Sequence, residues 1–246
     1  MRLAFSIQAT CRRGMSALRL RGAAGILRGM AFNSKQMPET ESRPGGLVMF
    51  WLFALLFAAD MAVPLVLGPY YPGYSHLHDT LSTLGHRHSP VFGIIAVWLV
   101  FFGVALCVLT FWSGLRAGQD RKHRIFSAGL LAFAMGAGIV AGLFPEDLPG
   151  EAETLNGKLH GIGAGLGSLG LLAGLMAGAV AGSVAGARKL ALGLSLVACA
   201  GFAVFLGSKG PQMYAGLWQK LYLGAAYLAV LVIVRAGLSA GGRTDR

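Results

Sequence analysis

Charged residues are scarce in this sequence. Only 13% of its 246 residues are Asp, Glu, Lys or Arg, whereas soluble domains carry roughly 25%. The mean hydropathy of +0.62 agrees with that shortage. Such a composition excludes a disordered chain, a collagen-like chain and a disulfide scaffold, and it argues against a water-soluble enzyme domain. We therefore expect an all-α, polytopic membrane protein.

Cysteine and acidic residues are also few. The three cysteines, Cys11, Cys107 and Cys199, form no CxxC motif and no cluster, so neither a zinc knuckle nor an external disulfide is indicated. Ten acidic residues against 21 basic ones leave a net charge of +11. Because the basic residues flank apolar runs and form no solvated stripe, we expect no nucleic acid as a partner. The expected partner is the lipid bilayer.

Six apolar runs are each long enough to cross a bilayer as a helix, which takes about 20 residues. They continue without the alternation of a β-strand, so helices are favoured over a barrel. Gly, Pro or charged residues separate them. Together they predict a six-helix transmembrane domain over residues 47–236. The runs are residues 46–68, 90–112, 125–144, 160–182, 190–207 and about 218–234.

Lysine and arginine predict the orientation, because they concentrate in cytoplasmic segments. With a cytoplasmic N-terminus, 17 of these residues fall inside and four fall outside, namely Arg87, Lys158, Lys209 and Lys220. We therefore expect an N-in, C-in protein of the cell (plasma or inner) membrane. Residues 237–246 would be a short cytoplasmic tail.

Residues 1–46 differ in composition from the rest. Residues 1–38 hold seven basic residues and no acidic one, as organelle transit peptides do. Their leucines and isoleucine form no helical stripe opposite the arginines, which weakens that interpretation. We favour a basic, disordered tail, or a chain that truly begins at Met30, Met37 or Met49.

Glycine is abundant, and in the fourth run it is periodic. A small residue at every fourth position lets another helix backbone approach closely. The periodic positions are Gly170, Gly174, Gly178, Gly182 and Gly186. We expect Gly129, Gly136 and Gly142 of the third run to offer the complementary surface, and the fourth run to be the central helix. The letters GLGSLG at residues 165–170 match a dinucleotide fingerprint, but they lie within an apolar run and no strand precedes them.

Five of the six histidines and five of the ten acidic residues fall on the external side, in the first and third loops and at the start of the fourth run. Residues 75–86 predict a short amphipathic helix, because Ser75, Asp79, Ser82 and His86 would share one face opposite three leucines. Two interpretations of this polar row stay open. The row either faces water or covers the outer side of a cavity between the spans.

Asp60 lies in the outer half of the first run, four residues before Pro64. An ionisable group at that depth is costly and usually functional, and it faces the bundle interior with a partner. Candidate partners are His160, Arg87 and the Tyr70–Tyr71 pair. A structural hydrogen bond between helices is the alternative.

Three short segments occur in a recognisable order. They are YSHLHDTLSTLG at residues 74–85, GLFPEDLP at residues 142–149 and LHGIGA at residues 159–164. In these segments the chain resembles domain-of-unknown-function family 998, a group of bacterial and archaeal six-helix membrane proteins. The resemblance covers residues 47–236 and implies a six-helix fold with a shared external site. The family supplies no established activity.

These observations favour a binding protein over an enzyme. The hypothesis is an integral membrane protein whose polar site at the external face binds a lipid headgroup, a small ligand or a partner. We expect the site residues to converge at the external ends of the spans. The candidate binding residues are Asp60, Ser75, Asp79, Ser82, Asp147 and His160.

Two alternatives remain. In a membrane-embedded, metal-dependent hydrolase acting on a lipid-like substrate, imidazoles and a carboxylate would hold Zn²⁺ and activate water. The candidate zinc ligands are His78, Asp79, Asp147 and His160, and zinc is the only candidate cofactor. In a transporter, Asp60 would be the coupling group.

Overall fold

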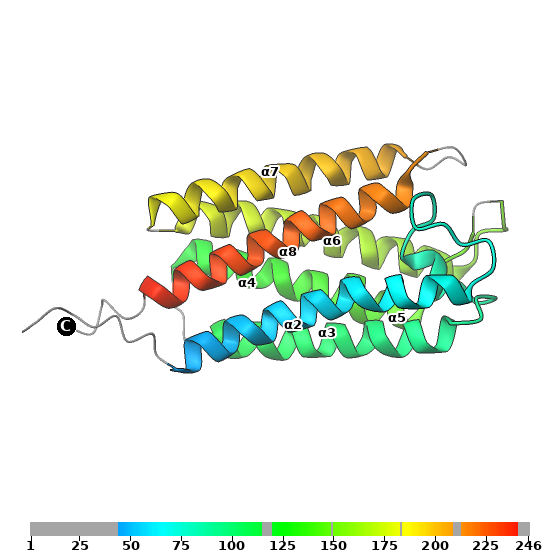
Figure 1. The fold of residues 1–246 in the computed structure, drawn as a ribbon, viewed down its shortest axis with the longest axis horizontal. Coiled ribbons are helices and arrows are strands. Elements are labelled where there is room, and N and C mark those ends of the chain that lie inside the picture. The colour runs from blue at the N-terminus through cyan, green and yellow to red at the C-terminus, as the bar shows by residue number, and fades with distance from the viewer. Residues whose placement is uncertain (1–43, 115–119, 149, 183, 209–212, 241–246) are drawn as a thin grey trace, which may run out of the picture. The chain divides into compact units, whose positions relative to one another are not determined.

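The structure is a computed structural model that describes residues 44–114, 120–148, 150–182, 184–208 and 213–240. Most of the expected tails at residues 1–46 and 237–246 lies outside the described residues, and the described parts, residues 44–46 and 237–240, are helical. Within the described part every regular element is helical, and six helices are long and apolar enough to cross a membrane (Figure 1). The elements are α2 (Pro44–Leu67), η1 (Gly68–Tyr70), η2 (Ser82–Gly85), α3 (Phe92–Gly114), α4 (Arg121–Phe133), the π-helix η3 (Ala134–Val140), α5 (Ala141–Leu143), α6 (Leu155–Ala181), α7 (Ala185–Gly207) and α8 (Ala215–Ala240).

The six spans confirm the prediction, but several helices begin earlier than the apolar runs do. Helices α4, α6 and α7 start four or five residues before the corresponding run. Their first turns contain polar or charged residues, which hydropathy alone assigns to loops. For α4 and α6 the cause is a side-chain cap. Asp120 and Thr154 each accept a hydrogen bond from the backbone N–H three residues on, at 2.7 and 3.2 Å.

The six spans pack side by side in one helical bundle. Helices α4 and η3 lie along α6, α7 lies along α8, and α2 contacts both α3 and α8 (Figure 1). Because the number of spans is even, α2 begins at the same end of the bundle where α8 finishes. We call this the basic end, and it includes residues 120–124 and 184–189. The opposite end, formed by residues 68–91, 144–148 and 150–154 and the start of α8, is the loop end. Which end is cytoplasmic stays a prediction.

Glycines form the interface between the third and fourth spans, as their spacing predicts, but the periodic series does not extend to its last two members. Gly182 is the C-cap of α6 and Gly186 belongs to α7. A Cβ atom added to Gly174 would lie 3.1 Å from the Cα of Gly129, and one added to Gly136 would lie 3.1 Å from the Cα of Gly167. The two backbones therefore touch without intervening side chains. The expectation for Gly142 is wrong, because it packs against α3. The fourth span packs against the third, fifth and sixth spans, but it is not the least exposed one, because α8 is slightly more buried.

Residues 75–86 do not form the continuous amphipathic helix that their spacing predicts. They form turns followed by the short 3₁₀-helix η2. Polar side chains take up the backbone donors here. Asp79 Oδ2 accepts from the N–H of Ser75 at 2.7 Å, and Thr80 Oγ1 accepts from the N–H of Thr83 at 3.2 Å. Such local hydrogen bonds compete with an α-helix.

Candidate functional site

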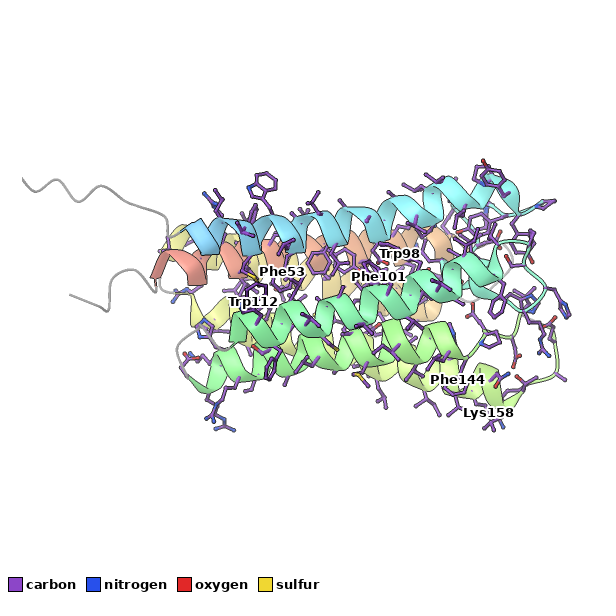
Figure 2. All side chains as sticks on the ribbon, turned by 90° about the horizontal axis from the view of Figure 1, so that it is seen from below. Phe53, Trp98, Phe101, Trp112, Phe144 and Lys158 are labelled. Atoms are coloured by element: carbon purple, nitrogen blue, oxygen red, sulfur yellow. The ribbon has the colours of Figure 1, made fainter. Side chains whose placement is uncertain are left out.

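Polar side chains concentrate at the loop end of the bundle. Figure 2 shows Phe144 and Lys158 at this end, Trp112 toward the opposite end and Trp98 between them. The first and third loops, which lie at this end, carry a marked excess of acidic over basic residues. The acidic residues in them are Asp79, Glu146, Asp147, Glu151 and Glu153, and the described basic residues at this end are Arg87, Lys158 and Lys220.

Asp60 lies among three helices and is buried, with 7% of its surface exposed. Its Oδ1 accepts a hydrogen bond from Trp98 Nε1 of α3 at 3.0 Å, and its Oδ2 accepts from the Tyr227 hydroxyl of α8 at 2.6 Å. Neither donor is among the partners considered from the sequence. Sequence reasoning missed them because aromatic residues occur in nearly every span, and spacing alone does not single out two of them.

Tyr227 also belongs to a cluster of rings, which we call the aromatic cluster (Phe57, Phe102, Phe133 and Tyr227). Its ring stacks on Phe57, with centroids 4.2 Å apart and planes within 7°. Phe102 and Phe133 lie 6.3 and 6.2 Å from it. The cluster joins α2, α3, α4 and α8 next to Asp60. This arrangement supports the structural alternative for Asp60, a carboxylate that ties helices together.

The first loop is bound to the start of α8. Lys220 Nζ donates to the carbonyl oxygen of His76 at 2.8 Å, and the N–H of Leu81 donates to Gln219 Oε1 at 2.5 Å. The second and third residues of α8 donate their N–H groups to loop carbonyls at 3.3 and 3.0 Å. The loop thereby satisfies donors that a helix N-terminus leaves free. Two polar residues in the first turns of the sixth span, Gln219 and Lys220, were the sequence signal for this contact.

The candidate residues of the first loop mainly maintain its shape. Asp79 accepts from the N–H of Ser75, whose hydroxyl lies 3.0 Å from His78 Nδ1. The His78 ring stacks on Tyr214, with centroids 5.1 Å apart. Ser82 begins η2 and is half-buried.

Asp147 secures the N-terminus of α6. Its Oδ2 accepts from the N–H of Thr154 at 2.6 Å, and its Oδ1 accepts from the Thr154 hydroxyl and from Arg87 Nη2, both at 2.9 Å. The N–H of Thr154 above all, then its hydroxyl and the Arg87 guanidinium, lower the pKa of Asp147. The carboxylate is therefore ionised at neutral pH. It packs so closely over Gly157 that a Cβ there would collide with it.

A second contact between the loops joins His86 to Glu151. His86 Nδ1 accepts from the N–H of His88 at 3.3 Å, so its Nε2–H donates to Glu151 Oε2 at 2.9 Å. His86 is 1% exposed. The hydrogen bond from His86, followed by one from the N–H of Leu148, lowers the pKa of Glu151. Two pairs, Arg87–Asp147 and His86–Glu151, thus hold the first and third loops together.

His160 is buried in the second turn of α6, with 3% of its surface exposed. Its Nδ1 lies 2.8 Å from the carbonyl oxygen of Phe144. Because a carbonyl only accepts, Nδ1 carries the proton and Nε2 is the acceptor of the neutral ring. This Nε2 is buried and has no hydrogen-bond partner among the described residues. Unpaired buried polar atoms are rare and cost about 1–3 kcal/mol, so Nε2 is an unused acceptor in this structure.

The hydrogen bonds divide the candidate residues into three groups. Asp147 and His160 lie along the start of α6, and Ser75 and Asp79 lie in the first loop. A hydrogen bond of 3.4 Å from Thr80 Oγ1 to Glu146 Oε2 connects the two loops that carry them. Asp60 forms a third group with its own partners, deeper in the bundle.

The four candidate zinc ligands are not arranged as a metal site. In the part of the chain that the structure describes, no three His, Cys, Asp or Glu side chains are grouped so that they could hold a metal ion. His78 and Asp79 instead bond to Ser75, as described above. Asp147 is occupied by Thr154 and Arg87, whereas His160 is bonded through Nδ1 alone and has no second candidate ligand grouped with its Nε2.

Comparison with known proteins identifies one family. A family model described as "Protein of unknown function (DUF998)" matches residues 54–236, well over half of the chain. No curated protein and no solved structure matches the chain. The matched residues include all the site residues described above.

Proposed function

This chain belongs to the DUF998 family of proteins of unknown function, and we propose that it binds a lipid headgroup or small ligand at the loop end of its six-helix bundle. The observation that carries this proposal is the buried Nε2 of His160, which has no partner while Nδ1 of the same ring is bonded to Phe144. A buried imidazole held in one tautomer presents its second nitrogen in a fixed direction.

The chemistry of the loop end limits the ligand. With its Nδ1–H donating to the Phe144 carbonyl, the His160 tautomer offers an acceptor at Nε2, so the ligand must supply an O–H or N–H donor. The carboxylates of Asp147 and Glu151, both with lowered pKa values, favour a neutral or positive group over an anion. A hydroxyl or a primary ammonium group meets both requirements.

Ligand binding needs fewer structural features than a metal-dependent hydrolase or a transporter does. A metal-dependent hydrolase depends on a cluster of ligands, and the described residues hold no group of three such side chains. A transporter coupled through Asp60 depends on a carboxylate that is available, whereas both of its oxygens accept hydrogen bonds. No specific contact favours these two alternatives.

The experiment compares two lipids with the same acyl chains. Dioleoylphosphatidylethanolamine has an ammonium group with N–H donors, and dioleoylphosphatidylcholine has none. Native mass spectrometry of the purified full chain should show preferential retention of phosphatidylethanolamine. Adding free ethanolamine as a competitor separates a headgroup site from one that also requires the acyl chains.

Two matched variants test whether His160 is responsible for the lipid preference. His160→Asn keeps a donor near the Nδ1 position but removes Nε2, so it should abolish the preference between the two lipids. His88→Asn changes an exposed histidine of the same end and should leave the preference intact. Equal retention of the two lipids by the wild type, or an unchanged preference in His160→Asn, would refute the proposal.

A further inference from the structure

A partly open cavity lies at the basic end of the bundle, opposite the loop end. It measures about 160 Å³ and is lined by residues of α4, α7, α8 and the last part of α6 with its C-cap. Most of its wall is small or aliphatic, with residues such as Gly178, Ala191 and Val232. Two side chains differ from the rest, His123 of α4 and Arg188 of α7. The lining is therefore mostly apolar and includes one histidine and one arginine.

The described charged residues around this cavity are mostly basic. Among the described residues at this end, Asp120 is the single acid. Its Oδ1 is occupied by the N–H and the ring Nδ1 of His123, both at 2.7 Å. The surroundings thus attract an anion. The described basic residues at this end are Arg121, Lys122, Arg124, Arg188, Lys189 and Arg235.

The start of α7 adds to this attraction. Its N-cap residue, Val184, provides no side-chain hydrogen bond to the first turn. The N–H groups of that turn, one turn from Arg188, therefore keep their partial positive charge. By contrast, α4 and α6 have side-chain caps at Asp120 and Thr154.

The size of the cavity and its neighbours indicate a part of a larger amphipathic molecule. Sites for whole drug-sized ligands measure about 300–1,000 Å³, so 160 Å³ holds only a fragment of a lipid. Exposed apolar side chains of α6 and α7 adjoin the cavity in the sequence, namely Val180, Val184 and Leu190, which are 45%, 45% and 55% exposed. They offer a surface on which acyl chains can lie.

We propose that this cavity binds an anionic phospholipid, with Arg188 pairing to the phosphate and the acyl chains lying against α6 and α7. A guanidinium donates two parallel hydrogen bonds to a phosphate, a geometry that an ammonium group does not offer. Helix ends lie at the depth of lipid phosphates in a bilayer. This site takes an acceptor group, whereas His160 at the other end takes a donor, so the two proposals stand or fall separately.

The test measures binding of dioleoylphosphatidylglycerol to the purified full chain by native mass spectrometry, with dioleoylphosphatidylcholine as the zwitterionic reference. Arg188→Gln should weaken phosphatidylglycerol binding about tenfold, the usual effect of losing one charge-assisted pair. The matched control is Lys189→Gln, which removes an equal charge beside the cavity. Its affinity should stay within about twofold of the wild type, because Lys189 is not part of the cavity wall.

A steric variant makes the test independent of charge. A Cβ added to Gly237, which lines the cavity, meets no atom within 4 Å, and the same holds for Gly186 outside the wall. Gly237→Leu should reduce phosphatidylglycerol binding, while Gly186→Leu should not.

Three results would overturn the proposal. They are equal binding of the two lipids by the wild type, equal losses in Arg188→Gln and Lys189→Gln, and competition by glycerol 3-phosphate as effective as that by the lipid. The last would indicate a site for a free phosphate compound. Thermal unfolding of each variant identifies a loss of binding that comes from misfolding, in which case the steric pair decides.

Discussion

Two interfaces of the same bundle are held together by opposite means. Between α4 and α6, glycine brings backbone against backbone, as at Gly129 and Gly174. Among α2, α3, α4 and α8, the aromatic cluster fills the space, and Asp60 of α2 accepts hydrogen bonds from α3 and α8. Lipid offers no hydrophobic drive for either contact, so close dispersion contacts must stabilise one and large rings with polar bonds the other. The first interface should therefore be sensitive to added atoms and the second to removed atoms.

The largest effect should come from emptying the aromatic interface. Tyr227→Ala removes a stacked ring and one donor to Asp60, so the free energy of unfolding should fall by about 3–5 kcal/mol. Denaturation of the purified protein in mixed micelles would measure this change. Tyr227→Phe keeps the ring and should recover most of the loss. An equal loss in both variants would mean that the hydroxyl, not the ring, holds this interface.

Crowding the glycine interface should have the next largest effect. In Gly167→Ala the new Cβ lies 2.9 Å from the backbone nitrogen of Ala137, so the helices must separate at a cost of about 1–3 kcal/mol. Gly165→Ala is the control on the same helix, because its Cβ meets nothing within 4 Å. It should stabilise the protein slightly, by up to about 1 kcal/mol, through helix propensity. If both variants behave alike in the same assay, close packing does not hold α4 to α6.

A smaller effect should follow from removing one hydrogen bond at Asp60. Trp98→Phe deprives Oδ1 of its donor, and the stability should fall by about 1 kcal/mol. Combined with Tyr227→Phe it leaves the carboxylate without either donor. The double variant should then lose more than the sum of the single losses, and a double-mutant cycle measures that excess. Strict additivity would show that the two donors act independently.

The smallest effect should appear at acidic pH and should spare both interfaces. The pKa values of Asp147 and Glu151 are lowered from their ordinary 3.8 and 4.5. Their stabilising contribution is therefore complete above about pH 4.5 and is lost as the pH falls through the lowered values. Thermal unfolding between pH 7 and pH 3 should show this decline, and Asp147→Asn should make it shallower. A decline that starts near pH 6 would point to a histidine instead.

The sequence predicts the spans well because a bilayer imposes one simple requirement, about 20 apolar residues in a helix. It also predicts the glycine contacts at Gly129, Gly136 and Gly174, since small-residue spacing has a direct geometric meaning. It fails at residues 75–86, where helical spacing is present but Asp79 and Thr80 bond to the backbone instead. Periodicity alone carries no information about that competition.

The candidate site could be predicted only in part. Residue type and depth indicated that Asp60 must have a partner, but not that Trp98 and Tyr227 supply it, because they come from helices far apart in the chain. The position of His160 at the start of a span was evident. That its Nδ1 binds the Phe144 carbonyl and leaves Nε2 unpaired depends on how the third loop folds back, which no local pattern specifies.

The dependence of the first loop on α8 has a consequence for the order in which the chain is assembled. The carbonyl of His76 and the N–H of Leu81 find their partners on Lys220 and Gln219, and Asp60 finds one on Tyr227. The second span can therefore be inserted long before the loop in front of it acquires its final hydrogen bonds. Until α8 has been synthesised and inserted, the first loop and Asp60 lack these hydrogen bonds. A chain truncated before α8 should keep its early spans in the membrane yet leave the first loop open to proteases.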